Sequence, residues 1–343
     1  MNTSRFQTLT GRYNKLRVAV VGDFCLDRYL EIDPARKEIS IETGLPVHNV
    51  VDVRSQPGAA GTILNNLVAL GVGEIHVVGF AGEDGEGFEL RRALASLPGV
   101  NLDGFLQTPL RQTFTYTKPL VVAPGKAPRE LNRLDRKNWT PTPPSLQREI
   151  AAVVRWLAEK VDAIVLMDQV DLAETGVVTR RVLEAVRVAA AKHPRLLVLA
   201  DSRRTLRDFP PVCLKMNRAE LSRLSRNISL RSRAAVRATA AKLARARGKP
   251  CFVTLAEHGI LGAWPDGTIE HLPALPTRGK IDIVGAGDAV TANLTAALAA
   301  GATLRESLEL ANAAASIVIH QLGTTGTASV TQLREVFFRR ARK

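Results

Sequence analysis

Residues 17–22 read Arg17-Val-Ala-Val-Val-Gly22, an uninterrupted run of four apolar residues that ends at a glycine. Such a short apolar run is typical of a parallel strand that is buried on both faces. Similar runs recur at residues 75–80, 163–167, 196–200 and 252–255. Segments with the apolar spacing of helices lie between and after these runs, at residues 58–71, 84–97, 146–161, 175–192, 231–247, 286–300 and 304–320. The alternation predicts an α/β fold, a doubly wound and mostly parallel sheet with helices on both faces.

Two stretches interrupt the alternation of strands and helices. Residues 28–56 and 107–135 alternate apolar and polar side chains and contain turn formers, as in Tyr29-Leu-Glu-Ile32 and Thr113-Phe-Thr-Tyr-Thr117. This pattern favours strands without intervening helices. We therefore expect a small antiparallel sheet that is inserted into the α/β domain as a lid. Because a lone monomer would leave its apolar face uncovered, we also expect the lid to form the clasp of a homodimer.

The composition is that of a globular protein. The chain has 343 residues, of which 45% are hydrophobic and 23% are charged. It has no run of 18 uncharged apolar residues, so we expect no membrane partner. Residues 1–16 lack the apolar stretch of a secretory signal. The three cysteines, Cys25, Cys213 and Cys251, are too few and too scattered for a disulfide framework, which favours reduced thiols in a cytoplasmic protein.

The net charge is strongly positive. Lys and Arg number 47 and Asp and Glu number 33, which gives +14 at pH 7. Such a charge first suggests nucleic acid as a partner. The basic residues are spread along the chain, however, and only three Tyr and three Trp are available for stacking on bases. We therefore expect no nucleic-acid partner, and the charge is explained equally by phosphorylated small molecules or by a solvated basic surface.

The segment Asp282-Ile-Val-Gly285-Ala286-Gly287-Asp288 precedes an alanine-rich helix. Its two glycines allow the backbone to approach a ligand closely. The first N–H groups of a helix point outward, and the helix dipole is positive there, so the segment is suited to hold an anion. Asp288 stands at the same helix start as a candidate base. The alternative is a tight turn in which Asp288 only caps the helix.

A second segment, Lys215-Met-Asn217-Arg-Ala-Glu220, precedes a basic helix. Asn217 and Glu220 are three residues apart and can lie on one helical face. Together they could hold Mg²⁺ through its waters, because Mg²⁺ takes few protein ligands. Taken alone, the segment fits a capping box at the helix start better.

Two further segments carry candidate substrate contacts. Asp27 follows the first predicted strand, and ligands of open α/β sheets bind beyond the carboxyl ends of the strands. Asp27 could accept hydrogen bonds from two sugar hydroxyls, or it could be an ordinary loop carboxylate. The turn Gly58-Ala-Ala-Gly61-Thr62 opens a helix and offers a close approach to a sugar or phosphate, although glycine-rich turns are common.

A further segment contains Thr254, Glu257 and Gly259, which lie where another predicted strand ends and leads into a turn.

In this order the segments resemble the ribokinase-like (PfkB) family of carbohydrate kinases, from about residue 17 to residue 338. The resemblance implies one kinase domain over residues 1–343, with the lid at 28–56 and 107–135. It implies ATP and Mg²⁺ as cofactors and a monovalent cation such as K⁺. The implied roles are catalysis for Asp288, Gly285, Ala286 and Gly287; nucleotide binding for Lys215, Asn217, Thr254, Glu257, Gly259 and Asn312; metal binding for Asn217, Glu220 and Asp282; and substrate binding for Asp27, Gly58 and Thr62.

Within the family, the heptose 7-phosphate kinase domain of ADP-heptose synthase is most similar. Residues 20–29, residues 39–47 and Leu131-Asn-Arg-Leu-Asp135 resemble its first strand, its lid and its R-x-D stretch. The chain departs from the family at Ala59, where a glycine is usual, and at Thr62, where an asparagine is usual. The resemblance implies an ATP-dependent sugar kinase with D-glycero-D-manno-heptose 7-phosphate as the leading acceptor. Its alternatives are a kinase of another sugar or nucleoside, and a catalytically silent sugar-nucleotide binding protein.

An acceptor that carries a phosphate requires cationic side chains near the lid, because a dianion needs charged donors. The lid segments offer five candidates, of which we expect at least two to contact the acceptor: Arg28, Arg36, Lys37, Arg111 and Lys118. The alternative is that these charges are only solvated.

Overall fold

The first predicted strand lies in the middle of the main sheet. The computed structural model describes residues 1–226 and 228–338. β1 (Arg17–Gly22) pairs in parallel with its neighbours on both sides, through Val20↔Val165 and Val20↔Val77. The strand order is β15-β14-β13-β12-β11-β10-β1-β4-β5, and β6 pairs with β4. The bounds are β4 (Glu74–Gly82), β5 (Val100–Asn101), β6 (Phe105–Thr108), β10 (Ala163–Asp168), β11 (Leu197–Ser202), β12 (Cys213–Asn217), β13 (Cys251–Thr254), β14 (Ile260–Ala263) and β15 (Ile269–Leu272).

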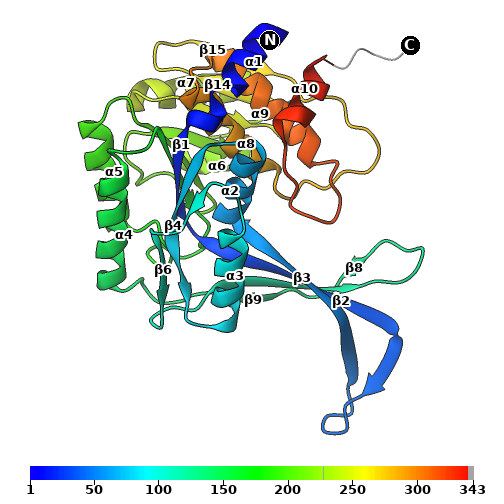
Figure 1. Ribbon diagram of the computed structural model, residues 1–343. Coiled ribbons are helices and arrows are strands. Elements are labelled where there is room, and N and C mark those ends of the chain that lie inside the picture. Colours follow the sequence, from blue (N-terminus) through cyan, green and yellow to red (C-terminus); the bar gives the residue numbers. More distant parts are fainter. Residues whose placement is uncertain (227, 339–343) are drawn as a thin grey trace.

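Helices cover both faces of this sheet, as the sequence predicts (Figure 1). Side chains alternate across a strand, so Val18 and Val20 of β1 contact one core while Ala19 and Val21 contact the other. The core on the side of Ala19 includes α4 (Pro144–Leu157), α5 (Arg180–Lys192), α6 (Arg218–Leu224) and α7 (Arg233–Arg247). The core on the side of Val18 includes α1 (Thr3–Thr10), α2 (Ala60–Ala69), α3 (Gly85–Ala95), α8 (Ala286–Ala299), α9 (Leu304–Val318) and α10 (Val330–Phe338).

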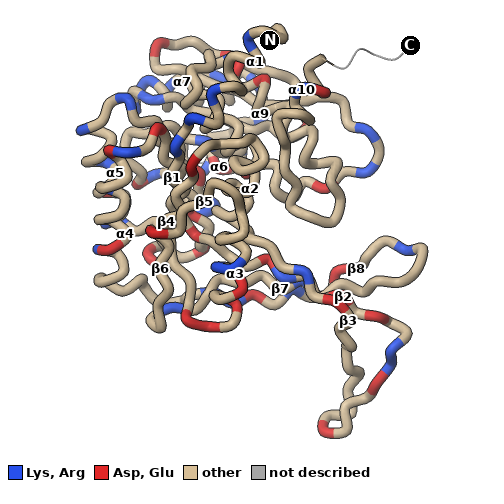
Figure 2. The backbone as a smooth tube through the Cα atoms, in the orientation of Figure 1, with Lys and Arg blue, Asp and Glu red and all other residues tan. Residues whose placement is uncertain are grey.

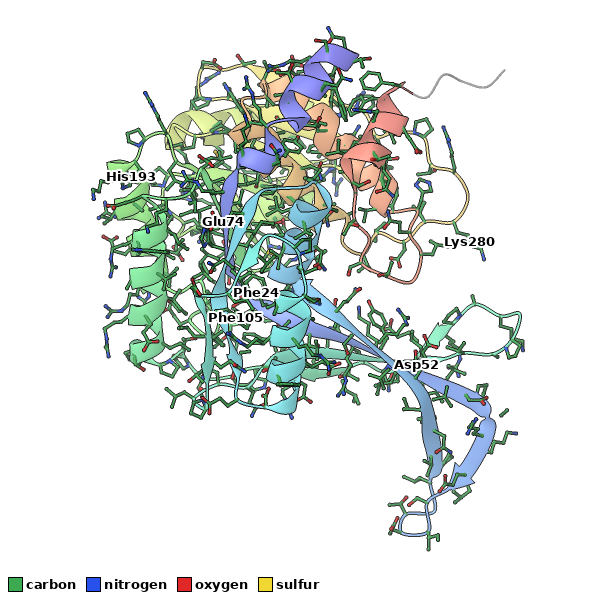
Figure 3. The ribbon with its side chains drawn as sticks, viewed as in Figure 1. Phe24, Asp52, Glu74, Phe105, His193 and Lys280 are labelled. Carbon is green, nitrogen blue, oxygen red and sulfur yellow. The ribbon has the colours of Figure 1, made fainter. Side chains whose placement is uncertain are left out.

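A second sheet extends from this body as a long arm (Figure 1). Its order is β3-β2-β7-β8, with β9 paired to β7. Phe24, at the start of β2, packs edge to face on Phe105 inside the body, whereas Asp52 lies out on the arm (Figure 3). The bounds are β2 (Phe24–Ile39), β3 (Pro46–Ala59), β7 (Phe114–Val121), β8 (Arg129–Glu130) and β9 (Leu134–Arg136).

One pairing in the arm differs from the expected antiparallel sheet. β2 and β3 form an antiparallel hairpin, but β2 and β7 are parallel, with Asp27 opposite Tyr116. Only strands joined by a short turn must be antiparallel. The connection from β3 to β7 instead passes through α2, β4, α3, β5 and β6, and β7 runs in the same direction as β2.

Several elements begin elsewhere than expected or were not predicted. The helix expected at 175–192 begins at Arg180, after Thr179 has capped it. The helix expected at 231–247 begins at Arg233, after the cap residue Ser232. The sequence does not predict α1, α10, β12, β14 and β15, which are all short. In β12, the polar residues Lys215 and Asn217 also interrupt the apolar pattern.

The length of the helices and the distribution of Lys and Arg bear on the membrane and nucleic-acid partners considered above. In the described part of the chain, no helix has both the length and the apolar character needed to cross a membrane. Lys and Arg are distributed over the helices, the loops and the arm (Figure 2).

Candidate active site

Two cavities meet at the carboxyl ends of the central strands. The chain continues from β1 to β4 on one side and later to β10 on the other, and ligands of open α/β sheets bind at such a reversal of strand order. The first cavity, of about 520 Å³, lies between β13, α8 and α9 and is here called the α8–α9 cavity. The second, of about 450 Å³, lies at β2 and β7 and is called the β2–β7 cavity. Both are lined by Ile283 and Gly287.

The α8–α9 cavity brings together most of the expected nucleotide contacts. Its walls combine apolar residues, such as Leu255, Val290 and Ile319, with a few polar groups. That combination suits a nucleotide base and sugar. Five residues from the nucleotide-binding prediction line it: Asn217, Thr254, Glu257, Gly259 and Asn312.

The β2–β7 cavity contains Asp27, Thr62 and Lys118. Gly58 lies directly behind Asp27, because a Cβ added to Gly58 would stand 2.6 Å from the Asp27 Cγ. A glycine is therefore needed there for Asp27 to keep its position. Burial raises the pKa of Asp27, while the charges of Lys118 and Arg133 oppose this shift. The carboxylate thus faces two cations in a pocket of a size suited to a sugar.

Lys118 is held against an aromatic ring. Its Nζ lies 4.9 Å from the centre of the Tyr29 ring, and the guanidinium of Arg54 also lies 4.9 Å from that centre. Cation–π contacts of this kind order a lysine side chain without neutralising its charge. Burial lowers the pKa of Lys118, but the charge of Asp27, the Tyr29 hydroxyl and the charge of Glu130 together outweigh this effect, so the pKa is raised overall. Lys118 therefore presents a full positive charge to the β2–β7 cavity.

The start of α8 lies where the two cavities meet. Gly285 precedes the helix with φ of +80°, a left-handed conformation that favours glycine. Within the described residues, the N–H groups of Gly287 and Asp288 make no hydrogen bond, whereas the N–H of Ala286 donates to the Ile283 carbonyl at 3.3 Å. Two free N–H groups at a helix start can hold an anion.

Asp288 faces the β2–β7 cavity from this helix start. Its Oδ1 accepts a hydrogen bond from Arg203 Nη2 at 3.1 Å. The helix dipole alone would favour the ionised form. In the structure, burial raises the pKa of Asp288, while the adjacent charge of Arg203 opposes the shift. A carboxylate with a raised pKa is a stronger proton acceptor, provided that it remains ionised.

The amino acid sequence also places this chain among known proteins. A family model described as pfkB family carbohydrate kinase matches residues 15–331. The chain belongs to this family. The bifunctional protein HldE of Geotalea uraniireducens is 31% identical over 95% of the chain, and that of Syntrophotalea carbinolica is 32% identical over 98%. The chain spans 64% and 66% of these two relatives, about two thirds or slightly less of their length.

Solved structures of carbohydrate kinases share the fold. The Arabidopsis thaliana ribokinase complexed with ribose and ATP superimposes with a TM-score of 0.69, at 20% identity, over 94% of this chain and 98% of that one. The phosphofructokinase-2 of Escherichia coli in complex with potassium gives a TM-score of 0.71 at 20% identity, with the same coverage. At these identities the likeness concerns the fold, which is ribokinase-like.

Lys215 of the kinase lies in neither cavity. Its Nζ forms an ion pair of 2.7 Å with Asp201, and both side chains are almost fully buried. Thr291 of α8 donates a hydrogen bond to the same Asp201 oxygen at 3.0 Å. The sequence predicts a nucleotide contact for Lys215, but its charge is already paired beneath Gly287.

Asn217 and Glu220 of the kinase form the capping box. Asn217 Oδ1 accepts from the Glu220 N–H at 2.9 Å, and Glu220 Oε2 accepts from the Asn217 N–H at 2.7 Å. The other Glu220 oxygen makes no hydrogen bond within the described residues. These residues fit Mg²⁺ held mainly through water, because one carboxylate oxygen remains available. Asp282 Oδ1 accepts from the Val284 N–H at 3.0 Å and lies in neither cavity.

Of the five cations expected near the acceptor, Lys118 lines the β2–β7 cavity and the other four do not. Arg28 approaches Glu89 at 3.6 Å, and Arg36 pairs with Asp33 at 3.3 Å. Arg111 is buried and donates to Thr140 and Thr175. Lys37 lies beside Arg36 on the outer arm. Arg28, Arg36 and Arg111 contact acceptors that lie closer to them than the cavity does. Lys37 lies too far out on the β2–β3 hairpin to reach the cavity.

Residues outside the set of predicted site residues also line this cavity: Tyr116, Arg133, Lys137, Gln169 and Arg203. Arg203 follows a predicted strand, so the rule that ligands bind beyond strand ends could have identified it. Arg133 pairs with Asp135 at 2.7 Å, and Lys137 with Asp171 at 2.8 Å.

Ala59 of the kinase has a backbone conformation that favours glycine, with φ of +54° and ψ of −114°. Strain of this kind costs about 1–3 kcal/mol. The Ala59→Gly variant is therefore expected to be more stable by about 0.5–2 kcal/mol, because glycine removes the strain but gains freedom in the unfolded chain. Urea denaturation of the two proteins measures the difference. A variant that is less stable than the wild type would contradict the strained backbone.

Proposed function

We propose that this sugar kinase transfers the γ-phosphoryl group of ATP to a sugar phosphate, with D-glycero-D-manno-heptose 7-phosphate as the acceptor and its 1-hydroxyl as the nucleophile. The observation that carries the proposal is the meeting of two cavities at Gly287, with Asp288 on the acceptor side. The resemblance of residues 39–47 to the heptose branch and the similarity to HldE proteins support the choice of acceptor.

In this proposal ATP occupies the α8–α9 cavity and the acceptor occupies the β2–β7 cavity. Asp27 accepts hydrogen bonds from sugar hydroxyls, and Asp288 accepts the proton of the attacking hydroxyl. The free N–H groups of Gly287 and Asp288 hold the negative charge of the group in transfer. Such transfer proceeds in line and depends mainly on positioning and electrostatics.

Metal ions complete the proposal. Asn217 and Glu220 would hold Mg²⁺, and Asp282 would hold a monovalent cation such as K⁺ beside the start of α8. Mg²⁺ would neutralise part of the charge on the ATP phosphates.

The acceptor phosphate would meet Lys118 first. Within the described residues, Lys118 forms no ion pair, while the other cations lining the cavity, Arg133, Lys137 and Arg203, are each paired with a carboxylate. A dianion can draw such paired cations to itself. The acceptor phosphate would therefore meet the unpaired positive charge of Lys118, and Arg133, Lys137 and Arg203 could add further positive charges.

A panel of acceptors with Mg-ATP tests this function. We expect kcat/KM for heptose 7-phosphate to exceed that for ribose, fructose and adenosine by at least about 100-fold. Equal efficiency with an unphosphorylated sugar or nucleoside would identify the other-sugar or nucleoside kinase. Tight sugar binding without any ADP formation would identify the silent binding protein.

The arm is proposed to join two copies of the chain. Val51 and Val53 lie two apart on β3, hence on the same face, and are 51% and 45% exposed. Other large exposed apolar residues of the arm are Ile39, Ile41, Leu45, Val50 and Leu134. A second copy would cover this surface, and the three buried free cysteines are consistent with a cytoplasmic location.

A double substitution, Val51→Lys with Val53→Lys, is expected to raise the dimer dissociation constant by at least about tenfold, because it places charges in an apolar interface. Sedimentation velocity measures the change. Val188→Lys on α5, which is similarly exposed at 43%, is the matched control and should leave the dimer intact. A wild-type protein that is monomeric at about 100 μM would contradict the clasp.

A further inference from the structure

Arg203 is the first residue after β11 and is held from two sides. Its backbone N–H donates to the carbonyl of Asp168, at the end of the neighbouring strand, at 2.9 Å. Its Nε donates to Gln169 Oε1 at 3.3 Å, and its Nη2 donates to Asp288 Oδ1 at 3.1 Å. The guanidinium is therefore fixed between the strand ends and the start of α8, in the wall of the β2–β7 cavity.

The remaining nitrogen of Arg203 points to the place where the cavities meet. Nη1 makes no hydrogen bond within residues 1–226 and 228–338. It lies 4.0 Å from the position that a Cβ on Gly287 would occupy, and Gly287 lines both cavities. Gly287 and Ile283 are the residues that line both cavities, so a group transferred between the cavities passes close to them. The free N–H groups of Nη1 are thus available at that point.

Lys215 is the other cation beside Gly287, but it is not equally available. Its Nζ lies 3.1 Å from the same Gly287 position, yet it is buried and paired with Asp201 at 2.7 Å. The Arg203 side chain is 37% exposed and keeps donors that no described residue uses. A planar guanidinium can also bind a carboxylate and a phosphoryl oxygen at once, which an ammonium does less well.

We propose that Arg203 is a catalytic residue that contacts the phosphoryl group in transfer while it holds Asp288 in place, an inference that rests on the proposed function. The acceptor oxygen forms a bond to the γ-phosphorus, and the bond from that phosphorus to the bridging oxygen of ADP breaks. The bonding pair leaves with ADP, and the hydroxyl proton goes to Asp288. Arg203 gives up no proton. Its Nη1 donates to an equatorial oxygen of the moving group.

The contact with Arg203 also leaves Asp288 with one oxygen for catalysis. Oδ1 accepts from Arg203, whereas Oδ2 has no partner within the described residues and can accept the acceptor's proton. The charged and titratable groups around Asp288 are Arg203, Asp201, Lys215, Asp27 and Cys25. Burial raises the pKa of Asp288, and Arg203 is the largest influence that opposes this shift. Removal of Arg203 should therefore move the acidic limb of the kcat–pH profile to higher pH.

The test compares Arg203→Gln and Arg203→Lys with Arg207→Gln. Arg207 is an exposed arginine four residues further on that forms no ion pair within the described residues, so it is a matched control. On the pH plateau we expect Arg203→Gln to lower kcat by about 100- to 1,000-fold, the effect of removing one donor to developing charge. The KM for ATP should stay within about threefold, because the contact forms in the transition state.

Binding of ADP with aluminium fluoride provides a readout that does not depend on turnover. This complex imitates the phosphoryl group in transfer, so the wild type should bind it more tightly than ADP alone. Arg203→Gln should lose that difference, and Arg207→Gln should keep it. Arg203→Lys keeps the positive charge but loses the planar set of N–H donors, so it is expected to be intermediate in both assays. If the Gln variant fails to fold, Arg203→Lys replaces it as the test variant.

A plateau kcat within about threefold of wild type in Arg203→Gln would overturn the inference, even if the acidic limb moves, because Arg203 would then only position Asp288. If the Gln variant does not fold, full activity of Arg203→Lys with normal aluminium fluoride binding overturns it equally. A wild type that phosphorylates no acceptor is a separate result. It would refute the proposed function, and the inference with it.

Discussion

The Asp288→Asn variant is expected to lose about 100- to 10,000-fold in kcat, or about 2.7–5.5 kcal/mol of transition-state stabilisation. Asparagine keeps the shape of the side chain and can still accept the hydrogen bond from Arg203, but it cannot take a proton. The α8–α9 cavity does not contain the Asp288 side chain, so the KM for ATP should stay within about threefold.

The pH dependence of the wild type supplies an independent check. Burial raises the pKa of Asp288, so the acidic limb of kcat should lie above the pH expected for an ordinary aspartate, and activity should fall as the pH drops through that raised pKa. The Asn variant should lack this limb. Asp208→Asn, at an exposed position, is the control. A variant that retains a third or more of the wild-type kcat would show that Asp288 is only a helix cap.

The Lys215→Met variant is expected to lower the free energy of unfolding by about 3–5 kcal/mol, because it leaves Asp201 buried without its partner. Urea denaturation measures the loss. The double variant Asp201→Asn with Lys215→Met removes both charges and should recover a large part of it. If Lys215 instead binds the nucleotide, Lys215→Met would lose ATP affinity at unchanged stability.

The loss in Lys215→Met should depend on pH in a defined direction. Burial pushes the pKa of Asp201 upward, but the charges of Lys215 and Arg203 and the hydrogen bonds from Lys215 and Thr291 together outweigh it, so the pKa lies below its usual value in the wild type. The ion pair therefore contributes stability above the pKa of an unfolded aspartate, and this contribution is lost as the pH falls through the lower folded pKa. In the variant the pKa of Asp201 rises. Its deficit should shrink between about pH 8 and pH 5, and a deficit that grows over this range would contradict the buried pair.

The sequence predicts five strands of the main sheet, namely β1, β4, β10, β11 and β13, because each is defined locally by an apolar run. The run at residues 17–22 and the succession of strands and helices after it identify a parallel sheet that is covered on both faces. Alternate side chains of β1 contact the two hydrophobic cores, as a strand that is buried on both faces requires. The pairing of β2 with β7 could not be read in this way. It joins segments about 90 residues apart, and nothing in either alternating pattern states its direction.

In the candidate site, too, local motifs could be predicted and long-range contacts could not. Residues in compact motifs, such as Gly285, Gly287 and Asp288, are brought to the meeting of the cavities. Of the five expected cations only Lys118 lines the β2–β7 cavity, because charge in a sequence does not reveal which carboxylate will be nearest after folding. The role of Arg203 depends on a contact across 85 residues of the chain, which only the folded geometry makes visible.

We propose that this kinase holds ATP and a sugar phosphate in two adjoining cavities and transfers a phosphoryl group between them. Phosphorus-31 NMR of the wild type with Mg-ATP and D-glycero-D-manno-heptose 7-phosphate tests it most directly. ADP and a new phosphate ester on the sugar are expected to appear in equal amounts, with no inorganic phosphate. Release of inorganic phosphate without a sugar product, or unchanged ATP in the presence of the acceptor, would contradict it.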